Sequence, residues 1–522
     1  MMSTVKRSVI TIGLLLANFT SYSSSAEEMI RQNSGFTLNE ATISSIRQAV
    51  LDNKVSCEAI VSSYLSRISS FDHAGMLPIN AIIATNPKAL DRAREIDRSP
   101  TEKNLPLACT PLIVKDNIDV KGMPTTAGSK SMRNNLPADN ATQVTRLEKA
   151  GAIVLAKSNL AEFAWTPDYS NSSLGGLTRN PYDPLRTTGG SSGGTAAAVA
   201  ANFGVAGLGT DTGASIRGPS ALQNLVGLRP TLGASSRDGV IPIWLTRDTL
   251  GPIARSVSDA ALLYQATYGY DPKDASTQAA RTAPSFDSAA VLRRGALNGM
   301  RVGVMRQVID AKNADPEVMQ RFQQAEDDLR TLGAVVVEVN LPDFKKLTDI
   351  PWPNRMEYDL NTYLQAEGAD RSVKSFAEVV KSGQYLGELS QFLKAQVGVP
   401  NPEDNPAERN DEKNTSALRA AIVGAMNREN LSVLIYPTWT QPPRLLTKMT
   451  GDGGNDNPVI AQAGLPAITV PMGNTRGNLP TGLQIAGRPF SEAVLFSAAY
   501  DYEQSTHHRT APLNLPAAAI AK

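Results

Sequence analysis

The chain has 522 residues, of which 41% are hydrophobic, so it is long and apolar enough for one large folded domain or roughly two or three average ones. Lysine and arginine number 51 against 50 aspartates and glutamates, and the formal net charge is +1. The apolar content excludes a wholly disordered chain. The balanced charge argues against nucleic acid or an acidic membrane surface as a partner.

The first 26 residues have the features of an export signal. Lys6 and Arg7 precede a short apolar run, and the small residues Ser24 and Ala26 suit a signal-peptidase site. We expect cleavage after Ala26, a mature domain over 27–522, and a periplasmic or secreted location. The apolar run is too short to cross a bilayer and no later run is long enough, so we expect no membrane span in the mature protein.

Two cysteines, Cys57 and Cys109, could form a disulfide, because an exported protein meets oxidising conditions. A pair of free buried thiols is the alternative, and the sequence leaves both open. The three histidines of the chain, His73, His507 and His508, are too scattered to form a metal site with them. We therefore expect neither a metal nor a cofactor.

Along the chain, apolar periodicity predicts helices over most of 37–96, with one strand at 79–84 and a helix that begins at Pro87. Further on, short apolar runs alternate with helical stretches, which is typical of a layered α/β fold. The predicted strands are 112–114, 152–156, 205–209, 300–305, 334–339, 431–438, 467–473 and 481–488. The predicted helices are 143–149, 159–165, 195–203, 317–332 and 491–504.

The stretch 343–430 differs from its surroundings because it has longer loops, a mostly helical pattern and no motif. We interpret it as a helical insertion and expect it to supply walls of a substrate pocket.

Lys115 directly follows the apolar run 112–114 and leads into a loop that contains Gly122 and Gly128. A lysine normally lies on the surface. At the end of a buried strand it would be desolvated, and a desolvated ammonium has a lowered pKa and can serve as a neutral base.

Two serine-containing loops need such a base. Ser191 and Ser192 lie between glycine pairs, and Ser215 ends a turn after the strand 205–209. Serine is a poor nucleophile unless a neighbouring base takes its proton. Because histidines are so few, Lys115 is the remaining base, and a second serine could carry the proton, which gives a Lys-Ser-Ser relay.

These residues lie in motifs that resemble the amidase signature family. The motifs are VKDN (114–117), NPYDPLRTTGG (180–190), GGSSGG (189–194), GTDTGASIR (209–217), VGLRPTLG (226–233) and the C-terminal GLPAITVPMG and LPTGLQIAGRPFSEA. The resemblance covers nearly all of the mature chain and is weakest over 343–430. It implies an α/β fold in which helices cover a mixed sheet, within a single large domain that carries the helical insertion.

The resemblance implies hydrolysis of a linear carboxamide, from a small molecule or a peptide, to a carboxylate and ammonia or an amine through a serine acyl-enzyme. Lys115 corresponds to the family's base, Ser191 to its bridging serine, usually preceded by a cis peptide bond, and Ser215 to its nucleophile. The backbone N–H groups of the nucleophile loop match the oxyanion hole: Thr212, Gly213, Ala214 and Ser215. Further residues match a supporting hydrogen-bond network: Ser192, Asp211 and Arg217. Arg217 could instead face a substrate carboxylate, and we favour the structural role.

Ala214 departs from the family, which usually has glycine at this position. If the residue needs a positive φ, its Cβ costs about 1 kcal/mol or more. Either the loop tolerates alanine or the oxyanion geometry is altered.

Three other interpretations remain. Gly190 to Gly194 fits the G-x-S-x-G elbow of α/β-hydrolases, with Ser192 as nucleophile and the late His507-His508, although the preceding residues resemble a loop rather than a strand. The chain could be one component of a tRNA-dependent amidotransferase, against which the export signal argues, or a binding protein without activity. Peptide, aryl, fatty and small aliphatic amides all fit the relay, and we expect loops around Trp165, Tyr169 and Trp352 to select among them.

Overall fold

The computed structural model describes residues 36–513 and 515, except 310–311, 353, 366–368, 400, 449–454 and 456–457. The predicted export signal lies outside the described residues. None of the helices within the described part has the length and apolarity that a membrane crossing requires.

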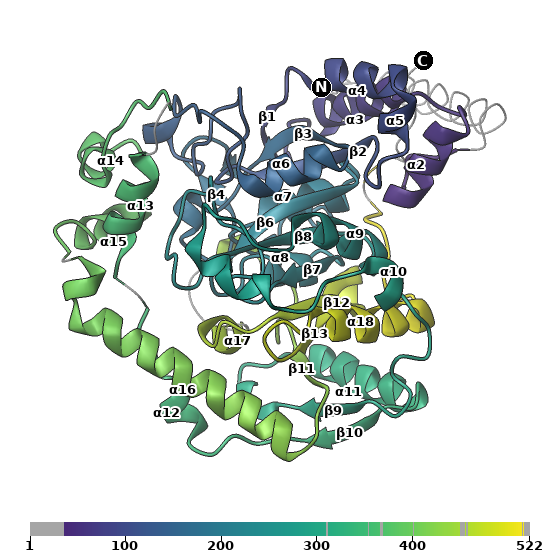
Figure 1. The fold of residues 1–522 in the computed structure, drawn as a ribbon, viewed down its shortest axis with the longest axis vertical. Helices are drawn as coiled ribbons and strands as arrows, with labels where there is room; N and C mark the ends of the chain where they lie inside the picture. Colours follow the sequence, from purple (N-terminus) through teal and green to yellow (C-terminus); the bar gives the residue numbers. More distant parts are fainter. Residues whose placement is uncertain are drawn as a thin grey trace, which may run out of the picture.

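An 11-stranded sheet runs through the middle of the molecule (Figure 1). In spatial order its strands are β1 (Ile82–Thr85), β3 (Ala152–Ser158), β2 (Thr110–Lys115), β6 (Ala206–Asp211), β8 (Thr249–Ala254), β7 (Val226–Arg229), β12 (Ala467–Thr475), β13 (Leu479–Ala486), β11 (Val433–Pro437), β9 (Arg301–Val304) and β10 (Val335–Glu338). β2 pairs in parallel with β3 and β6, whereas β8 is antiparallel to β6 and β7. The sheet is therefore mixed, and the predicted α/β fold class is confirmed.

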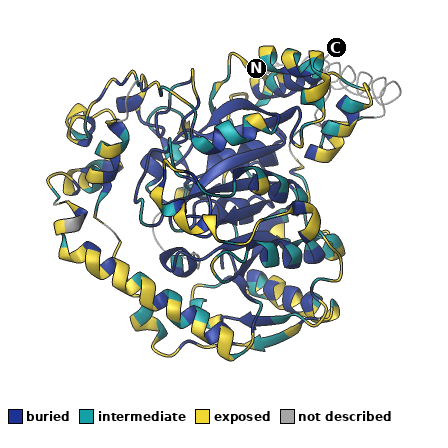
Figure 2. Cartoon of the chain, viewed as in Figure 1, coloured by how far each residue is buried: buried dark blue, intermediate teal, exposed yellow. Residues whose placement is uncertain are grey.

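The strands around β2 are buried at every position, as expected for strands that helices cover on both faces (Figure 2). The helices outside the 343–430 stretch are α2 (Ile43–Leu51), α3 (Cys57–Phe71), α4 (Ala89–Arg98), α5 (Pro100–Lys103), α6 (Thr142–Lys149), α7 (Gly193–Ala200), α8 (Arg217–Ala221), α9 (Val257–Thr267), α10 (Ser288–Val291), α11 (Pro316–Thr331), α17 (Pro458–Gln462) and α18 (Glu492–Thr506). α7 is buried along its whole length. It lies so close to β6 that a Cβ on Gly207 would come within 2.4 Å of Thr195.

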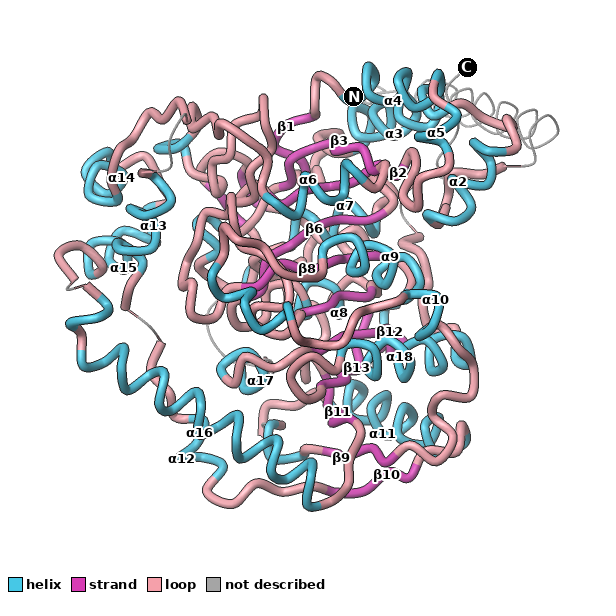
Figure 3. The backbone as a smooth tube through the Cα atoms, in the orientation of Figure 1, coloured by secondary structure: helices cyan, strands magenta, loops and turns pink. Residues whose placement is uncertain are grey.

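Residues 343–430 add no strand to the sheet in their described part (Figure 3). Their α-helices are α12 (Phe344–Thr348), α13 (Met356–Leu364), α14 (Phe376–Ser382), α15 (Ser390–Ala395) and α16 (Pro406–Arg428). Helices α13 to α15 lie together at one side of the molecule and share a separate apolar cluster with Ala127, Met132, Phe163 and Ile241 of the loops that flank the sheet (Figure 1). This arrangement agrees with the helical character expected from the sequence.

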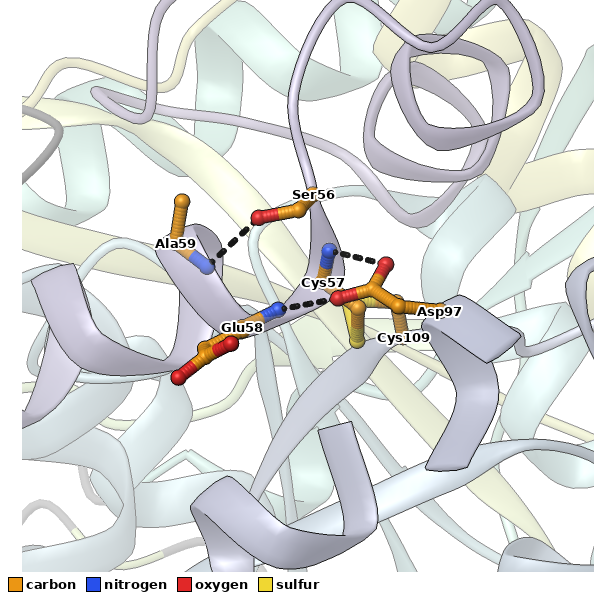
Figure 4. The surroundings of a disulfide bond; sticks show 6 residues. All are labelled: Ser56, Cys57, Glu58, Ala59, Asp97 and Cys109. Atoms are coloured by element: carbon orange, nitrogen blue, oxygen red, sulfur yellow. Dashed lines mark hydrogen bonds between the residues drawn. A yellow bond between two sulfur atoms is a disulfide. The ribbon is translucent and has the colours of Figure 1, made fainter. Parts of the chain in front are cut away.

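The cysteine pair forms a disulfide between Cys57, the first residue of α3, and Cys109, which directly precedes β2 (Figure 4). The carboxylate of Asp97 accepts hydrogen bonds from the backbone N–H groups of Cys57 and Glu58 at 2.8 and 2.9 Å, so it fixes the start of α3. The bond joins residues 52 positions apart. Closing a loop of that size removes chain entropy from the unfolded state and contributes about 4 kcal/mol to stability.

One predicted helix is wrong. Residues 159–165 form only a short 3-10 turn, Glu162–Ala164, in which Phe163 and Ala164 have positive φ. Tertiary contacts override the helical propensity here, because the N–H of Phe163 donates to the carbonyl of Ala127 at 2.9 Å and Glu162 accepts from Ser173 N at 2.8 Å.

Candidate active site

The expected catalytic residues meet at one edge of the sheet. Because β2 and β6 are parallel neighbours, their carboxyl ends lie side by side. Lys115 is the last residue of β2, and the loop that ends at Ser215 follows β6. Ser191 and Ser192 lie just before α7, which packs across both strands.

Lys115 is fully buried, and its Nζ lies 2.7 Å from Ser191 Oγ and 2.7 Å from Thr210 Oγ1. No carboxylate of the described residues comes within ion-pair distance of this Nζ. Burial therefore lowers the pKa of Lys115 to about 7, even though the more distant Asp248 and Asp211 act to raise it. The group can hold or release a proton near neutral pH.

The backbone on both sides of Ser191 is fixed by hydrogen bonds. The peptide bond from Gly190 to Ser191 is cis, as the resemblance implies. Gly190 N donates to the carbonyl of Pro167 at 2.7 Å, and the carbonyl of Ser191 accepts from Ala161 N at 3.0 Å. A Cβ on Gly190 would lie 2.4 Å from the carbonyl oxygen of Tyr169, so only glycine fits.

Ser192 joins the two serine loops to β6. Its N–H donates to the carbonyl of Ser215 at 3.1 Å, and its Oγ donates to the carbonyl of Thr210 at 3.1 Å. The side chain does not line the cavity beside Ser215, and the chain enters α7 from a loop rather than a strand. This geometry is wrong for the α/β-hydrolase elbow with Ser192 as nucleophile.

Asp211 forms the centre of a fully buried ion-pair cluster. Its carboxylate pairs with Arg217 at 3.1 Å and with Arg229 at 3.0 Å, and it accepts from Ile216 N at 3.0 Å. Burial alone would raise the pKa of Asp211, but the two guanidinium groups hold it well below its usual range. Arg217 also donates to the carbonyl of Gly213 at 2.9 Å. Both sides of the Ser215 loop are thereby tied to β6, and Arg217 does not line the cavity.

The N–H groups of Gly213, Ala214 and Ser215 have no hydrogen-bond acceptor among the residues that the structure describes. Thr212 Oγ1 donates to Asp248, whose carboxylate also accepts from the N–H groups of Ile243 and Trp244 at 3.0 Å. The loop therefore presents free donors while its side-chain contacts hold it in place. Burial raises the pKa of Asp248 to about 6, and these hydrogen bonds oppose the rise.

Alanine at position 214 is compatible with the loop. Ala214 does not have a positive φ, and its side chain is buried in an apolar cluster with Leu222 and Trp439. Of the two outcomes left open by the sequence, the tolerant loop is the one observed.

A cavity of about 380 Å³ opens beside Ser215 and the loop from Thr212 to Ala214. Ser215 is only 5% exposed, and it is the one residue of the Lys115-Ser191-Ser215 set that lines the cavity. Trp165 and Trp352, which the sequence singled out, both line it, whereas Tyr169 does not.

The three histidines lie elsewhere. His73 hydrogen-bonds Asn80 at 3.0 Å, His508 lies 3.2 Å from Asp328, and His507 ends α18. In the described part of the chain, no group of acidic, histidine and cysteine side chains is placed to hold a metal ion.

Sequence reasoning missed the groups that surround the site. Thr210 contacts Lys115, Asp248 holds the nucleophile loop, and Gln484 of β13 accepts from Arg217 at 2.7 Å. The adjacent charges Arg247-Asp248 were the available signal, because buried charges need partners, but the strand that follows them, β8, was not predicted and so their burial was not expected. Gln484 lies 267 positions from Arg217 and had no local signal.

The mixed α/β sheet brings a buried lysine into hydrogen-bond contact with a serine, next to a loop whose backbone N–H groups have no acceptor among the described residues. This arrangement is that of a serine-type hydrolase. The family model described as Amidase matches residues 59–496, and the chain belongs to this family. It is an amidase that acts on amides.

The relatives include hydrolases and one component of a transferase. The chain is 34% identical to a glutamyl-tRNA(Gln) amidotransferase subunit of Moorella thermoacetica, over 88% of this chain and 95% of that protein. Native peptide amidase from Stenotrophomonas maltophilia superposes with a TM-score of 0.80 at 33% identity, over 90% of this chain and 98% of that chain. An amidase family protein from Bacillus anthracis gives 0.78 at 28% identity, over 96% and 95%.

Proposed function

We propose that the protein cleaves a linear carboxamide through an acyl-enzyme on Ser215, with Ser191 and Lys115 as the proton relay. The observation that carries the proposal is the 2.7 Å contact between Lys115 Nζ and Ser191 Oγ, in a site that lowers the pKa of Lys115 to about 7. Neutral Lys115 can accept a proton near neutral pH, which a charged lysine cannot do.

In the acylation step two coupled proton transfers along the relay remove the proton of Ser215. Ser191 gives its proton to Lys115 and takes the proton of Ser215, while the Oγ of Ser215 bonds to the amide carbonyl carbon. The unpaired N–H groups of Gly213, Ala214 and Ser215 are the donors for the resulting oxyanion. The relay then returns the proton to the nitrogen, the C–N bond breaks, and ammonia or an amine leaves.

Deacylation uses the same groups in the same order. Water gives a proton to the relay and bonds to the ester carbonyl carbon of the acyl-enzyme. The bond to Ser215 breaks, Ser215 regains a proton from the relay, and the product leaves as the carboxylic acid, which gives its proton to the solvent and becomes the carboxylate. The cluster of Asp211, Arg217 and Ser192 supports both steps by fixing the two serine loops against β6.

The assignment of the nucleophile is tested with the Ser215→Ala variant and with a phosphonate that labels reactive serines. Ser215→Ala should abolish acyl-enzyme formation while the circular-dichroism spectrum stays unchanged. A serine-reactive phosphonate should label Ser215 and leave Ser192 unlabelled, as read by mass spectrometry of peptides. Labelling of Ser192, or full activity of the Ser215→Ala protein, would contradict the proposal.

The similarity to an amidotransferase component favours a second candidate, in which the chain supplies ammonia within a larger complex. Glutamine would then be the amide donor. Hydrolysis of simple amides by the purified single chain, with no glutaminase activity, would exclude this candidate.

We also propose that the protein is exported, on the basis of the basic and apolar N-terminus and of the Cys57–Cys109 disulfide. Disulfides persist in oxidising compartments. Protein recovered from the cell envelope or the medium should begin at Glu27, as determined by N-terminal sequencing. Active protein outside the cytoplasm that still carries Met1 would contradict this proposal.

A further inference from the structure

Aromatic rings line the cavity beside Ser215. The rings of Trp244 and Trp352 stack with centroids 5.2 Å apart and an interplanar angle of 24°. Trp165 also lines the cavity and contacts Phe392 of α15, with centroids 4.0 Å apart. Three of the four tryptophans of the chain therefore surround the space next to the nucleophile loop.

Trp352 lies directly against the oxyanion loop. A Cβ on Gly213 would come within 2.8 Å of Trp352 Cη2, so the ring covers this residue. The guanidinium of Arg247 lies over the same ring, 5.0 Å from its centroid. Arg247 pairs in turn with Asp411 of α16 and donates to the carbonyl of Pro351 at 3.2 Å. The stretch 343–430 thus holds one wall of the cavity in place.

The described residues that line the cavity offer no counter-charge to a ligand. None of the described residues that line it is ionisable at neutral pH: beside the tryptophans and the nucleophile loop these are Ala164, Pro167, Ile243, Asn455 and Pro458. A charged group that enters such a space loses its hydration without gaining a partner, which is costly. At about 380 Å³ the cavity is at the small end of ligand pockets and suits a single ring rather than a long chain.

We infer that the acyl group of the substrate carries one uncharged aromatic ring, which lies between Trp165 and the Trp244–Trp352 pair, and that Trp352 is a specificity-determining residue. The inference rests on the proposed function, because it takes the amide carbon to be next to Ser215. Trp352 is 47% exposed, so its ring has surface against which an aromatic acyl group can pack.

The experiment compares three primary amides that release ammonia: phenylacetamide, acetamide and glutamine. The wild-type protein should have its highest kcat/KM for phenylacetamide and its lowest for glutamine, which carries two charges. Trp352→Ala should lower the ratio of kcat/KM for phenylacetamide over acetamide by about tenfold or more, and Trp352→Phe should restore most of it. Tyr358→Ala is the matched control, since Tyr358 is a 41% exposed aromatic residue outside the cavity, and it should keep the wild-type ratio.

Binding gives a second readout that does not need turnover. In a Ser215→Ala background, phenylacetamide should change the tryptophan fluorescence at saturation, and adding Trp352→Ala should raise its dissociation constant. An unchanged specificity ratio and dissociation constant in the Trp352→Ala proteins, or a wild-type preference for glutamine, would overturn the inference. Absence of hydrolysis of every amide, with phenylacetamide binding intact, would count against the proposed function and leave the inferred pocket standing.

Discussion

Two buried lysines lie on adjacent parallel strands, and their surroundings differ in one respect. Lys115 ends β2, and Lys157 lies in β3, where its register partner is Val114. Both are 0% exposed. Lys157 pairs with the carboxylate of Asp116 at 3.0 Å, whereas Lys115 contacts the hydroxyl groups of Ser191 and Thr210.

The comparison separates burial from reactivity. Desolvation disfavours the charged form of any buried lysine, and a neighbouring carboxylate compensates for it. Lys157 has such a carboxylate in Asp116, which directly follows the end of β2. Lys115 lacks one and is left with hydroxyl partners that can exchange protons. A buried lysine therefore becomes a candidate base only where no carboxylate is within reach.

The largest expected effect comes from Lys115→Ala. With no group to accept the serine proton, kcat should fall by about a thousandfold or more. The midpoint of thermal unfolding should fall less than in a variant that breaks the Lys157–Asp116 pair, because removal of Lys115 leaves no carboxylate without its partner. Steady-state kinetics and a melting curve measure the two effects. A kcat within tenfold of wild type would remove the distinction between the two lysines.

The opposite pattern is expected of Lys157→Met. Removing one member of a buried pair leaves Asp116 uncompensated, and the free energy of unfolding should drop by about 3–5 kcal/mol. The protein that remains folded should keep kcat within about tenfold, after titration of active sites. In the double variant Asp116→Leu/Lys157→Met much of the stability should return. Loss of turnover without loss of stability would make Lys157 part of the chemistry.

The pH dependence of kcat/KM is a further test of Lys115 as the base. Below pH 7 or so Lys115 is protonated and cannot act as a base, so kcat/KM should rise as pH increases through about 7 and stay high on the alkaline side. A rate profile measured in buffers of constant ionic strength tests this. A rise centred near the ordinary lysine pKa of about 10.4 would contradict it.

The same shift has a consequence for stability. The pKa of Lys115 is about 7 when folded and about 10.4 when unfolded, so between these values the unfolded chain binds more protons. The free energy of unfolding of wild type should therefore rise with pH across this window, relative to Lys115→Met. Urea unfolding at several pH values provides the measurement, and a falling difference would contradict the assignment.

The smallest effect is expected of His507→Ala/His508→Ala. Neither side chain lines the cavity, and the partly exposed contact of His508 with Asp328 is worth at most about 1 kcal/mol. Turnover should stay within about twofold of wild type in the same kinetic assay. A loss of turnover comparable to that of Lys115→Ala would instead support a mechanism in which a histidine is the base.

The sequence predicted most of the sheet because its strands are continuous apolar runs, such as 112–114 within β2 and 152–156 within β3. It did not predict the neighbouring strands β7 and β8, which pair antiparallel. The glycine, proline and threonine content of β8 masks its strand character, and β7 has only four residues. The burial of Lys115 followed from its place at the end of an apolar run. The contact of Lys115 with Ser191 was expected from the family resemblance, whereas its contact with Thr210, 95 positions away, was not. The pairing of Lys157 with Asp116 was not expected either, because it depends on which strands are neighbours.

The relay and one wall of the cavity come from different stretches of the chain, whereas Trp165 and Trp244 of the cavity come from the stretch that also carries the relay or its loops. Lys115, Ser191 and Ser215 come from strands and loops of the sheet, whereas Trp352 and its Asp411-held neighbour Arg247 connect the cavity to residues 343–430, whose described part adds no strand. Mutations in that stretch can alter the acyl preference while the relay stays intact. Such a division allows an inherited catalytic apparatus to acquire new substrates by local change, without rebuilding its core.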